Sequence, residues 1–309
     1  MAVPTLYNQI DANRRKTFLL MVGFSIFIIA VTYILVFALG YEGGGALGFA
    51  GIFLIISGFI NFGSYYWSDK LVLGISGAKQ IGKDDNPDLY RVVENLTIAT
   101  GTPMPKIYVV DDPAPNAFAT GRDPNHAAIA FTTGLLQRLE KLELEGVAAH
   151  ELSHVRNYDT RLMSIVVVLV GMIALLTDIF FRSLWWGGQR GGDKGGGNAF
   201  RLIAGVMVAI LAPIAAQIIK LAISRKREFL ADSSGALITR NPESLASALL
   251  KISSDANPAK SATAATAHLF ITNPFKGKQG SSWFTNLFMT HPPVEERVEA
   301  LRSSIGQAV

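Results

Sequence analysis

Long apolar runs alternate with polar regions along the chain. Residues 17–40 and 46–67 contain no charged side chain, and two further apolar runs cover residues 162–181 and 199–223. A transmembrane helix needs about 20 mainly apolar residues to cross roughly 30 Å of hydrocarbon, and each run reaches that length. The first run is too long for the apolar core of a signal peptide, and no cleavage motif separates it from the second. The pattern therefore predicts four membrane spans in two hairpins.

Basic residues predict the orientation of the first hairpin. Three of them precede the first span at positions 14–16, and Lys70 and Lys79 follow the second, whereas the loop between the spans carries only Glu42. Cytoplasmic flanks of membrane proteins are enriched in Lys and Arg. We therefore expect the N-terminus and the region after residue 68 to face the cytoplasm.

The second hairpin does not follow the same charge rule. Arg182 precedes its Gly-rich linker, residues 187–198, and the linker itself carries Arg190 and Lys194. A third full span would nevertheless place this basic linker outside. The pattern leaves two alternatives: the first hairpin dominates the topology, or residues 162–223 form a shallow hairpin that lies partly in protein or at the interface.

The region between the hairpins, residues 69–160, has the mixed pattern of a domain outside the bilayer. A helical period begins at Asn86-Pro87. Two runs of strand-forming residues follow at 106–110 and 127–132, and the segment 116–121 between them is a candidate third strand. An exposed edge strand of such a sheet can bind an extended peptide by backbone hydrogen bonds, although a purely structural meander has the same pattern.

Composition fits a membrane protein and narrows the chemistry. Half of the residues are hydrophobic, 17% are charged, and the mean hydropathy is +0.31, which is unusual for a soluble globule. The chain has no Cys, which excludes disulfides, thiolate nucleophiles and Cys-based zinc sites. Its net charge of +4 does not indicate nucleic acid, because basic and aromatic residues are not interleaved. A basic rim facing a membrane explains the excess more simply.

The strongest chemical signal is the sequence His150-Glu151-x-x-His154. Two His residues four positions apart project from one face of a helix, so both rings can bind one tetrahedral zinc ion. Glu151 lies on the same turn, within reach of a water that the metal activates. The alternative is an amphipathic helix with two exposed His and a neighbouring Glu. Acidic residues just before the motif, Glu140 and Glu143 among them, suit a helix N-terminus outside the bilayer.

A second motif supplies the third ligand that a catalytic zinc site needs. Glu228 and Asp232 are again one helical turn apart, so Glu228 is a candidate ligand and Asp232 a candidate acceptor for a ligand His N–H. Taken alone, this pair is better explained as acids on a helix surface among basic neighbours. Its combination with the His motif favours the metal site. An antiparallel hairpin over residues 162–223 would return the chain to the same side of the membrane and bring the two motifs together.

Together these motifs resemble the HtpX family of membrane zinc metalloproteases, distant relatives of the CAAX prenyl endopeptidases. The similarity covers most of the chain, including the two N-terminal spans and the inserted hairpin. It rests on the motifs NAFATG at 116–121, HELSHVRNYD at 150–159, REFLAD at 227–232 and THPP at 290–293.

The resemblance implies a role for each matching residue. His150, His154 and Glu228 would bind Zn2+. Glu151 would be the general base and acid, and Asp232 would orient a His. The segment at 116–121 would lie beside the cleft, where related enzymes align the substrate as an added strand. The candidate substrate-binding residues in it are Asn116, Ala117, Phe118 and Ala119.

Two residues near the C-terminus each have two interpretations. His291 either donates to the developing oxyanion as a catalytic residue or caps the helix that Pro292-Pro293 begins. Arg297, a further candidate for substrate binding, either pairs with a carboxylate in the cleft or lies on the surface.

We therefore predict a mainly helical α+β protein with four hydrophobic spans and a zincin-like metallopeptidase domain that contains a small sheet with an exposed edge strand. Its expected parts are an N-terminal transmembrane hairpin (1–68), a first part of the catalytic domain (69–160), a second hydrophobic hairpin (161–223) and a second part of the catalytic domain (224–309).

The expected function is that of an integral membrane zinc endopeptidase. The resemblance implies misfolded or damaged membrane proteins as substrates, and a multi-pass location in the cell inner membrane with the catalytic domain in the cytoplasm. A CAAX-type prenyl-protein protease is an alternative, disfavoured because four spans make no large helical chamber. A non-proteolytic scaffold with a structural metal is another, disfavoured by the open fourth position and by Glu151. The expected partners are polypeptide substrates and the lipid bilayer, without nucleic acid, and the sequence indicates no oligomeric state.

Overall fold

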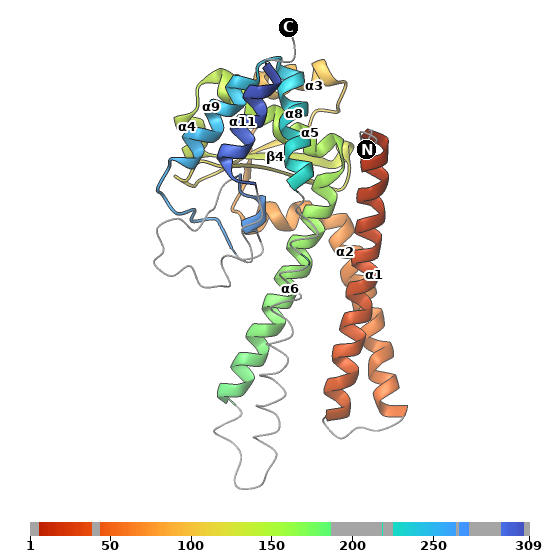
Figure 1. Ribbon diagram of the computed structural model, residues 1–309. Coiled ribbons are helices and arrows are strands. Elements are labelled where there is room, and N and C mark those ends of the chain that lie inside the picture. The colour runs from red at the N-terminus through yellow and green to blue at the C-terminus, as the bar shows by residue number, and fades with distance from the viewer. Residues whose placement is uncertain are drawn as a thin grey trace.

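The computed structural model describes residues 6–38, 44–186, 218, 225–263, 266–271 and 292–305. In this part of the chain, a head of helices and a small sheet stands on long helices that all extend from it in one direction (Figure 1). The long helices are α1 (Leu6–Ala38), α2 (Gly44–Ile75) and α6 (Asp159–Trp186). The mainly helical α+β class predicted from the sequence is confirmed.

The described part of the sheet has four strands in the order β1-β2-β4-β3. The two central strands, β2 (Lys106–Val110) and β4 (Ala127–Thr132), are parallel to each other, while β1 (Lys79–Gln80) and β3 (Ala117–Gly121) are antiparallel to their neighbours. The two strands and the third candidate strand predicted from the sequence are confirmed. The expectation of an exposed edge is wrong for β3, because all five of its residues are buried where α5 (Lys141–Arg156), α6 and η3 (Ala267–Leu269) pack against it.

The two faces of the sheet bury different cores. On one face, Ile107, Ile129 and Phe131 pack against helices of the head. On the other, Phe118 and Ala130 pack with residues of the long helices. Successive strand residues alternate between faces, so a strand buried on both faces carries an apolar run, as β4 does from Ala127 to Phe131. The sheet therefore separates the helices of the head from the long helices.

The remaining helices belong to the head, and their ends follow from local chemistry. The predicted helix at Asn86-Pro87 is α3: the Asn86 side chain accepts from the Leu89 N–H, and Gly101 ends the helix at φ 64°. The helices and turns of the head are α3 (Pro87–Thr100), η1 (Pro124–His126), α4 (Thr133–Arg138), α5, α8 (Arg225–Thr239), α9 (Pro242–Ser253), η3 and α11 (Val294–Ile305).

Glycine allows two helices of the head to approach α5 closely. A Cβ on Gly235 of α8 would lie 3.1 Å from the His150 backbone nitrogen. A Cβ on Gly146 of α5 would lie 2.9 Å from the Leu245 nitrogen of α9. These small residues let α8 cross α5 directly at the His motif, which places the second predicted motif against the first.

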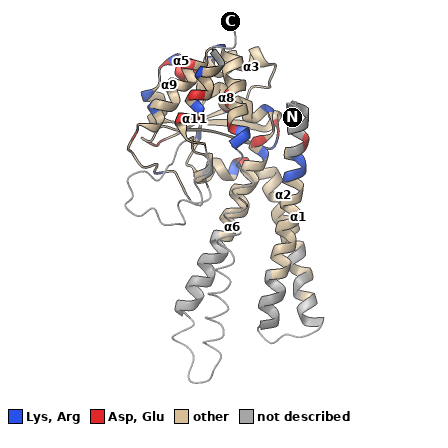
Figure 2. Ribbon diagram, in the orientation of Figure 1, with Lys and Arg blue, Asp and Glu red and all other residues tan. Residues whose placement is uncertain are grey.

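No helix among the described residues is long and apolar enough to cross a membrane. The four spans predicted from the sequence therefore stay predictions, and the run at 199–223 lies outside the described residues apart from Ile218. The linker at 187–198 and His291 also lie outside them. Charged residues gather on the head and at the adjoining end of α1, whereas the described remainder of the long helices carries almost none (Figure 2).

Candidate metal centre

Helix α5 carries the three residues of the first motif into the interior of the head. His150, Glu151 and His154 are each at most 4% exposed. The helix starts at a capping interaction, in which the Glu143 carboxylate accepts from the Glu140 N–H at 2.8 Å. Because His150 and His154 are one turn apart, their rings project side by side with centroids 4.8 Å apart. The alternative interpretation, an amphipathic helix with two exposed His, is therefore wrong.

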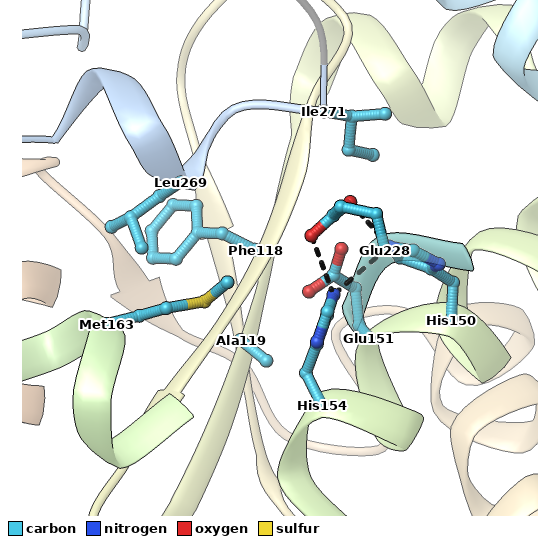
Figure 3. A pocket seen from close by; sticks show the side chains of 9 residues that line it. All are labelled: Phe118, Ala119, His150, Glu151, His154, Met163, Glu228, Leu269 and Ile271. Carbon is cyan, nitrogen blue, oxygen red and sulfur yellow. Dashed lines mark hydrogen bonds and ion pairs between the residues drawn. The ribbon is translucent and has the colours of Figure 1, made fainter. Parts of the chain in front are cut away.

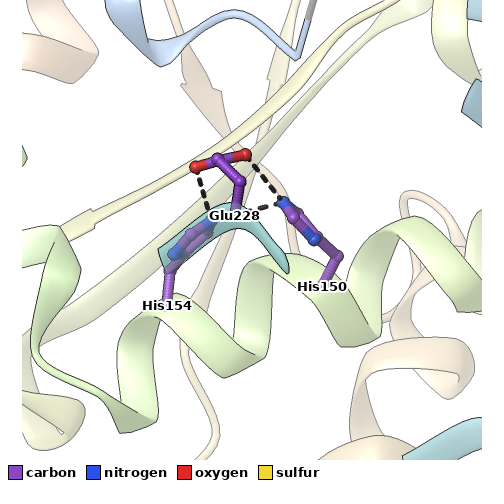
Figure 4. A group of neighbouring side chains, drawn as sticks. All are labelled: His150, His154 and Glu228. Atoms are coloured by element: carbon purple, nitrogen blue, oxygen red, sulfur yellow. Dashed lines mark hydrogen bonds and ion pairs between the residues drawn. The ribbon is translucent and has the colours of Figure 1, made fainter. Parts of the chain in front are cut away.

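Glu228 of α8 completes a group of three ligand atoms (Figure 4). The Nε2 atoms of His150 and His154 are 3.2 Å apart, and they lie 3.8 and 3.7 Å from the two Glu228 carboxylate oxygens. Zinc binds such nitrogen and oxygen atoms at about 2.0–2.2 Å, which places the ligand atoms of a tetrahedral site about 3.3–3.6 Å apart. The donor set and its spacing thus fit a zinc ion.

Glu151 lies next to this group without belonging to it (Figure 3). Burial raises the pKa of its carboxyl, and the Glu228 charge adds to the rise, against the opposing effect of His150 and His154. A hydrogen bond from the backbone of Ala119 in β3 also reaches the carboxylate. A raised pKa brings a carboxylate closer to the range in which it can both accept and return a proton.

A carboxylate on α8 orients the first histidine. Asp232 Oδ1 lies 3.0 Å from His150 Nδ1, the ring nitrogen that faces away from the ligand group. Arg297 of α11 holds the same carboxylate with two hydrogen bonds of 2.8 and 2.6 Å, and its Nη1 lies 3.7 Å from Glu228 Oε2. Although burial raises the pKa of Asp232, the Arg297 guanidinium and its hydrogen bonds lower it below the usual value. Asp232 is therefore ionised and fixed.

A different carboxylate orients the second histidine. Asp159, at the start of α6, places Oδ2 3.1 Å from His154 Nδ1. Asn13 of α1 donates to Asp159 Oδ1 at 2.7 Å, and Arg227 Nη1 lies 3.6 Å from the same oxygen. Burial lowers the pKa of His154, but the Asp159 hydrogen bond and the Glu228 charge outweigh it and raise the pKa to about 9. Without a metal, both nitrogens of the His154 ring are therefore protonated at neutral pH. The proton on Nε2 must leave before that nitrogen binds a metal.

A cavity of about 20 Å³ lies at the ligand group. Its apolar wall is formed by Phe118 and Ala119 of β3, Met163 of α6, and Leu269 and Ile271 of the segment that follows α9 (Figure 3). A cavity needs roughly 10–15 Å³ to hold one water, so this space fits a metal ion or a water but not a peptide.

Comparison with known proteins agrees with this geometry. The family description "Peptidase family M48" matches residues 83–305. Proteins named "Protease HtpX homolog" from Caldanaerobacter subterraneus subsp. tengcongensis and Tropheryma whipplei are 46% and 45% identical to the chain, each over 98% of this chain and 99% of the relative. The homolog from Dictyoglomus thermophilum is 46% identical over 96% of this chain and 94% of its own.

The chain belongs to peptidase family M48. It is a metalloprotease that uses zinc, it is membrane-associated, and its resemblance to the HtpX family is confirmed. Its substrates are polypeptides. Among solved structures, the crystal structure of S. mikatae Ste24p is similar with a TM-score of 0.47 and 17% identity. That likeness covers 88% of this chain, which spans about 61% of the Ste24p chain, and it is too distant to bear on activity.

Within this M48 protease, the predicted substrate-binding residues do not all lie at the cavity. Phe118 and Ala119 line it, whereas Ala117 packs in the core of the head. Asn116 is buried outside the lining, where its side-chain oxygen accepts from the Ile271 N–H at 2.9 Å. Arg297 is fully buried and pairs with Asp232 and Glu228, so the surface alternative for it is wrong.

The sequence places Asp159 in the motif at 150–159, with local hydrogen bonding as its expected role, but it did not predict the pairing of Asp159 with His154, and it did not single out Asn13. Asp159 follows His154 by five residues, and a carboxylate at that distance, just past the end of the helix, was a usable signal for a His partner. Asn13 gives no such signal, because it lies 146 positions before Asp159 in an unremarkable polar stretch.

Proposed function

We propose that His150, His154 and Glu228 hold the zinc ion of this M48 protease and leave its fourth position open to water and substrate. The match between the spacing of the three donor groups and a tetrahedral site carries this proposal. When bound, zinc polarises the scissile carbonyl and lowers the pKa of its water. Asp232 and Asp159 keep the two rings turned so that each presents Nε2 to the site.

Glu151 then serves as the proton carrier. Its carboxylate borders the small cavity beside the ligand group, where it accepts the proton of the attacking water. The same side chain returns that proton to the leaving amine. Its raised pKa supports both steps, because neither transfer is far uphill. His291 stays a candidate donor to the oxyanion.

The substrate is proposed to enter as an extended strand beside β3. Ala119 already reaches Glu151 through its backbone, so a peptide paired with this strand would pass over the catalytic carboxylate. The cavity is too small for a peptide, and Leu269 and Ile271 form part of its wall. Binding therefore requires these two side chains to move, and the hydrogen bond between Asn116 and Ile271 would loosen in that step.

Misfolded or damaged membrane proteins are the proposed substrates, cleaved at the cytoplasmic face of a multi-pass protein. The membrane association of the family, the four apolar runs and the basic flank at residues 14–16 support this arrangement. The proposed parts keep the boundaries 1–68, 69–160, 161–223 and 224–309. In this arrangement the two parts of the catalytic domain meet where α8 crosses α5.

Replacement of Glu151 by Gln tests the proposal. Purified E151Q is expected to keep one zinc per chain and to lose cleavage of an unfolded protein substrate by at least about 100-fold, because the amide cannot accept the proton. Cleavage by E151Q at the wild-type rate would refute the role of Glu151. A panel of peptides with and without a C-terminal prenylated Cys checks the substrate class, since cleavage of the prenylated peptides alone would contradict a general endopeptidase.

A further inference from the structure

A second, larger cavity lies away from the metal centre, between α1 and α6. Its volume is about 350 Å³, and it follows α1 from Lys16 to Phe27. Leu162 of α6 and Ile218 line the opposite side. Lys16, at one end, is the polar side chain among the described lining residues. The space is thus a long apolar slot with a cation at its mouth.

Further cations surround the mouth. Partial burial lowers the pKa of the Lys16 ammonium, and the positive charges of Arg227 and Arg15 lower it further. The acid that acts on Lys16 in the opposite direction is Asp159, whose oxygens bind His154 and Asn13 and lie 3.6 Å from the Arg227 guanidinium, so one carboxylate faces three cations. The mouth therefore carries an excess of positive charge that suits an anion.

Aromatic rings lie against two further cations, one of which, Arg14, precedes Arg15 and Lys16 in the chain. The guanidinium groups of Arg14 and Arg161 lie 5.1 and 5.0 Å from the centroid of the Tyr158 ring, and Arg161 also lies 5.3 Å from that of Tyr65. Tyr and Trp are enriched at membrane–water interfaces, where basic side chains also gather. Trp67, two residues after Tyr65, is 52% exposed. In a membrane-associated protease, the mouth of the slot therefore lies at the level of lipid headgroups.

We infer that the slot binds one acyl chain of an anionic phospholipid, whose phosphate lies at Lys16. Basic pockets between membrane helices are sites for anionic lipid headgroups, and an apolar slot beneath them fits the attached chain. The inference goes beyond the proteolytic function and does not depend on which residues hold zinc.

Gly23 offers a direct way to close the slot. It lines the cavity, and a Cβ at this position would meet no atom within 4 Å. A Leu side chain at position 23 would therefore extend into the space of the acyl chain without a backbone clash. Gly171 of α6 is a matched control, because a Cβ there also meets nothing within 4 Å and Gly171 does not line the slot.

The experiment is native mass spectrometry of the purified full-length protein in detergent, titrated with dioleoyl phosphatidylglycerol or dioleoyl phosphatidylcholine. The wild type is expected to retain one phosphatidylglycerol per chain and to bind it at least about fivefold better than phosphatidylcholine. The affinity of G23L for phosphatidylglycerol should be at least about tenfold lower, and the affinity of G171L should equal that of the wild type. K16Q should still bind phosphatidylcholine like the wild type but lose most of the preference for phosphatidylglycerol, because the slot stays open while the cation that lines it is lost.

Three results would overturn the inference: equal binding of the two lipids by the wild type, wild-type phosphatidylglycerol binding by G23L, or an equal loss in G171L. If G23L does not fold, L20F reduces the same slot from a neighbouring turn and should show the same selective loss. Retained binding in L20F would then count against the slot. Cleavage of an unfolded protein by E151Q and by the wild type is a separate assay, so failure of the lipid inference leaves the protease proposal testable.

Discussion

The two histidines of the metal centre are alike in sequence but are held by different parts of the molecule. Asp232 lies against His150 and is itself fixed by Arg297, so this support comes from α8 and α11 of the head. Asp159 lies against His154 and is fixed by Asn13, which belongs to the long helix α1. One histidine is thus supported within the catalytic head, and the other is tied to the region predicted to enter the membrane.

The two carboxylates also differ in how their charge is balanced. Arg297 binds Asp232 through two short hydrogen bonds, which compensate most of that charge. Asp159 accepts a hydrogen bond from the neutral amide of Asn13, and the Arg227 guanidinium lies farther away, at 3.6 Å. More of the Asp159 charge therefore acts on its histidine, consistent with the raised pKa of His154. The comparison suggests two tests: how much each carboxylate adds to zinc affinity, and how much to folding.

The largest effect is expected for D232A. Removal of this carboxylate takes the strongest ion-pair partner away from Arg297, which is fully buried. The loss of a buried ion-pair partner lowers the free energy of unfolding by about 3–5 kcal/mol. Zinc affinity should fall by about 10–100-fold as well, since His150 loses its orienting group. Thermal unfolding in detergent and a competitive zinc chelator measure the two effects. Unchanged stability would show that Arg297 does not depend on Asp232.

D159A is expected to separate the two effects. Its zinc affinity should fall by about 10–100-fold, as for D232A, because His154 loses the same kind of support. The loss of stability should be smaller, about 1–3 kcal/mol, since Asp159 accepts from the neutral Asn13 amide and lies 3.6 Å from the Arg227 guanidinium, whereas Asp232 accepts two short hydrogen bonds from Arg297. A stability loss equal to that of D232A would remove the proposed difference between the two sides.

The pH dependence of zinc binding should depend on His154 and its partner Asp159. His154 is protonated below about pH 9, so zinc competes with one proton there and its affinity should rise about tenfold per pH unit until about pH 9. In D159A the hydrogen bond and charge that raise this pKa are gone, and the plateau should start at a lower pH. The measurement is a chelator titration at a series of pH values. An identical pH profile in D159A would contradict the assignment of Asp159.

The smallest effect is expected for N13A. Asp159 keeps Arg227 nearby, so zinc affinity should fall less than tenfold, while the lost hydrogen bonds destabilise the junction of α1 with the head by about 1–3 kcal/mol. N61A is the matched control, because Asn61 is also a buried amide but bonds Ser25 and the Met21 carbonyl between α1 and α2. If both variants change zinc affinity equally, α1 has no specific link to the metal centre.

The sequence predicted the carboxylate that supports His150 but not the one that supports His154. Glu228 and Asp232 share a helical face, so their spacing and the His motif predicted that they act together. The strands at β2 and β4 were also predictable, because each is a continuous run of strand-forming residues. Such features depend on neighbours within one element.

The features that the sequence missed or left open depend on contacts between distant elements. Asn13 and Asp159 are 146 positions apart, and Arg297 and Asp232 are 65 apart, so no local period relates them. Burial of β3 depends on helices that come before and after it in the chain, and its sequence alone predicted an exposed edge as readily. A side chain that contacts the site from a distant element can be assigned to it only once the fold is known.

The most direct test of the zinc centre is the metal content and zinc X-ray absorption spectrum of the wild type beside E228A. The wild type should hold one zinc per chain, with two imidazole nitrogens and carboxylate oxygen at about 2.0–2.2 Å. E228A should retain well under one zinc per chain after dialysis and show no carboxylate ligand in any remaining metal. A full complement of zinc in E228A with an unchanged spectrum would contradict the assignment of Glu228, and with it the way in which α8 completes the site on α5.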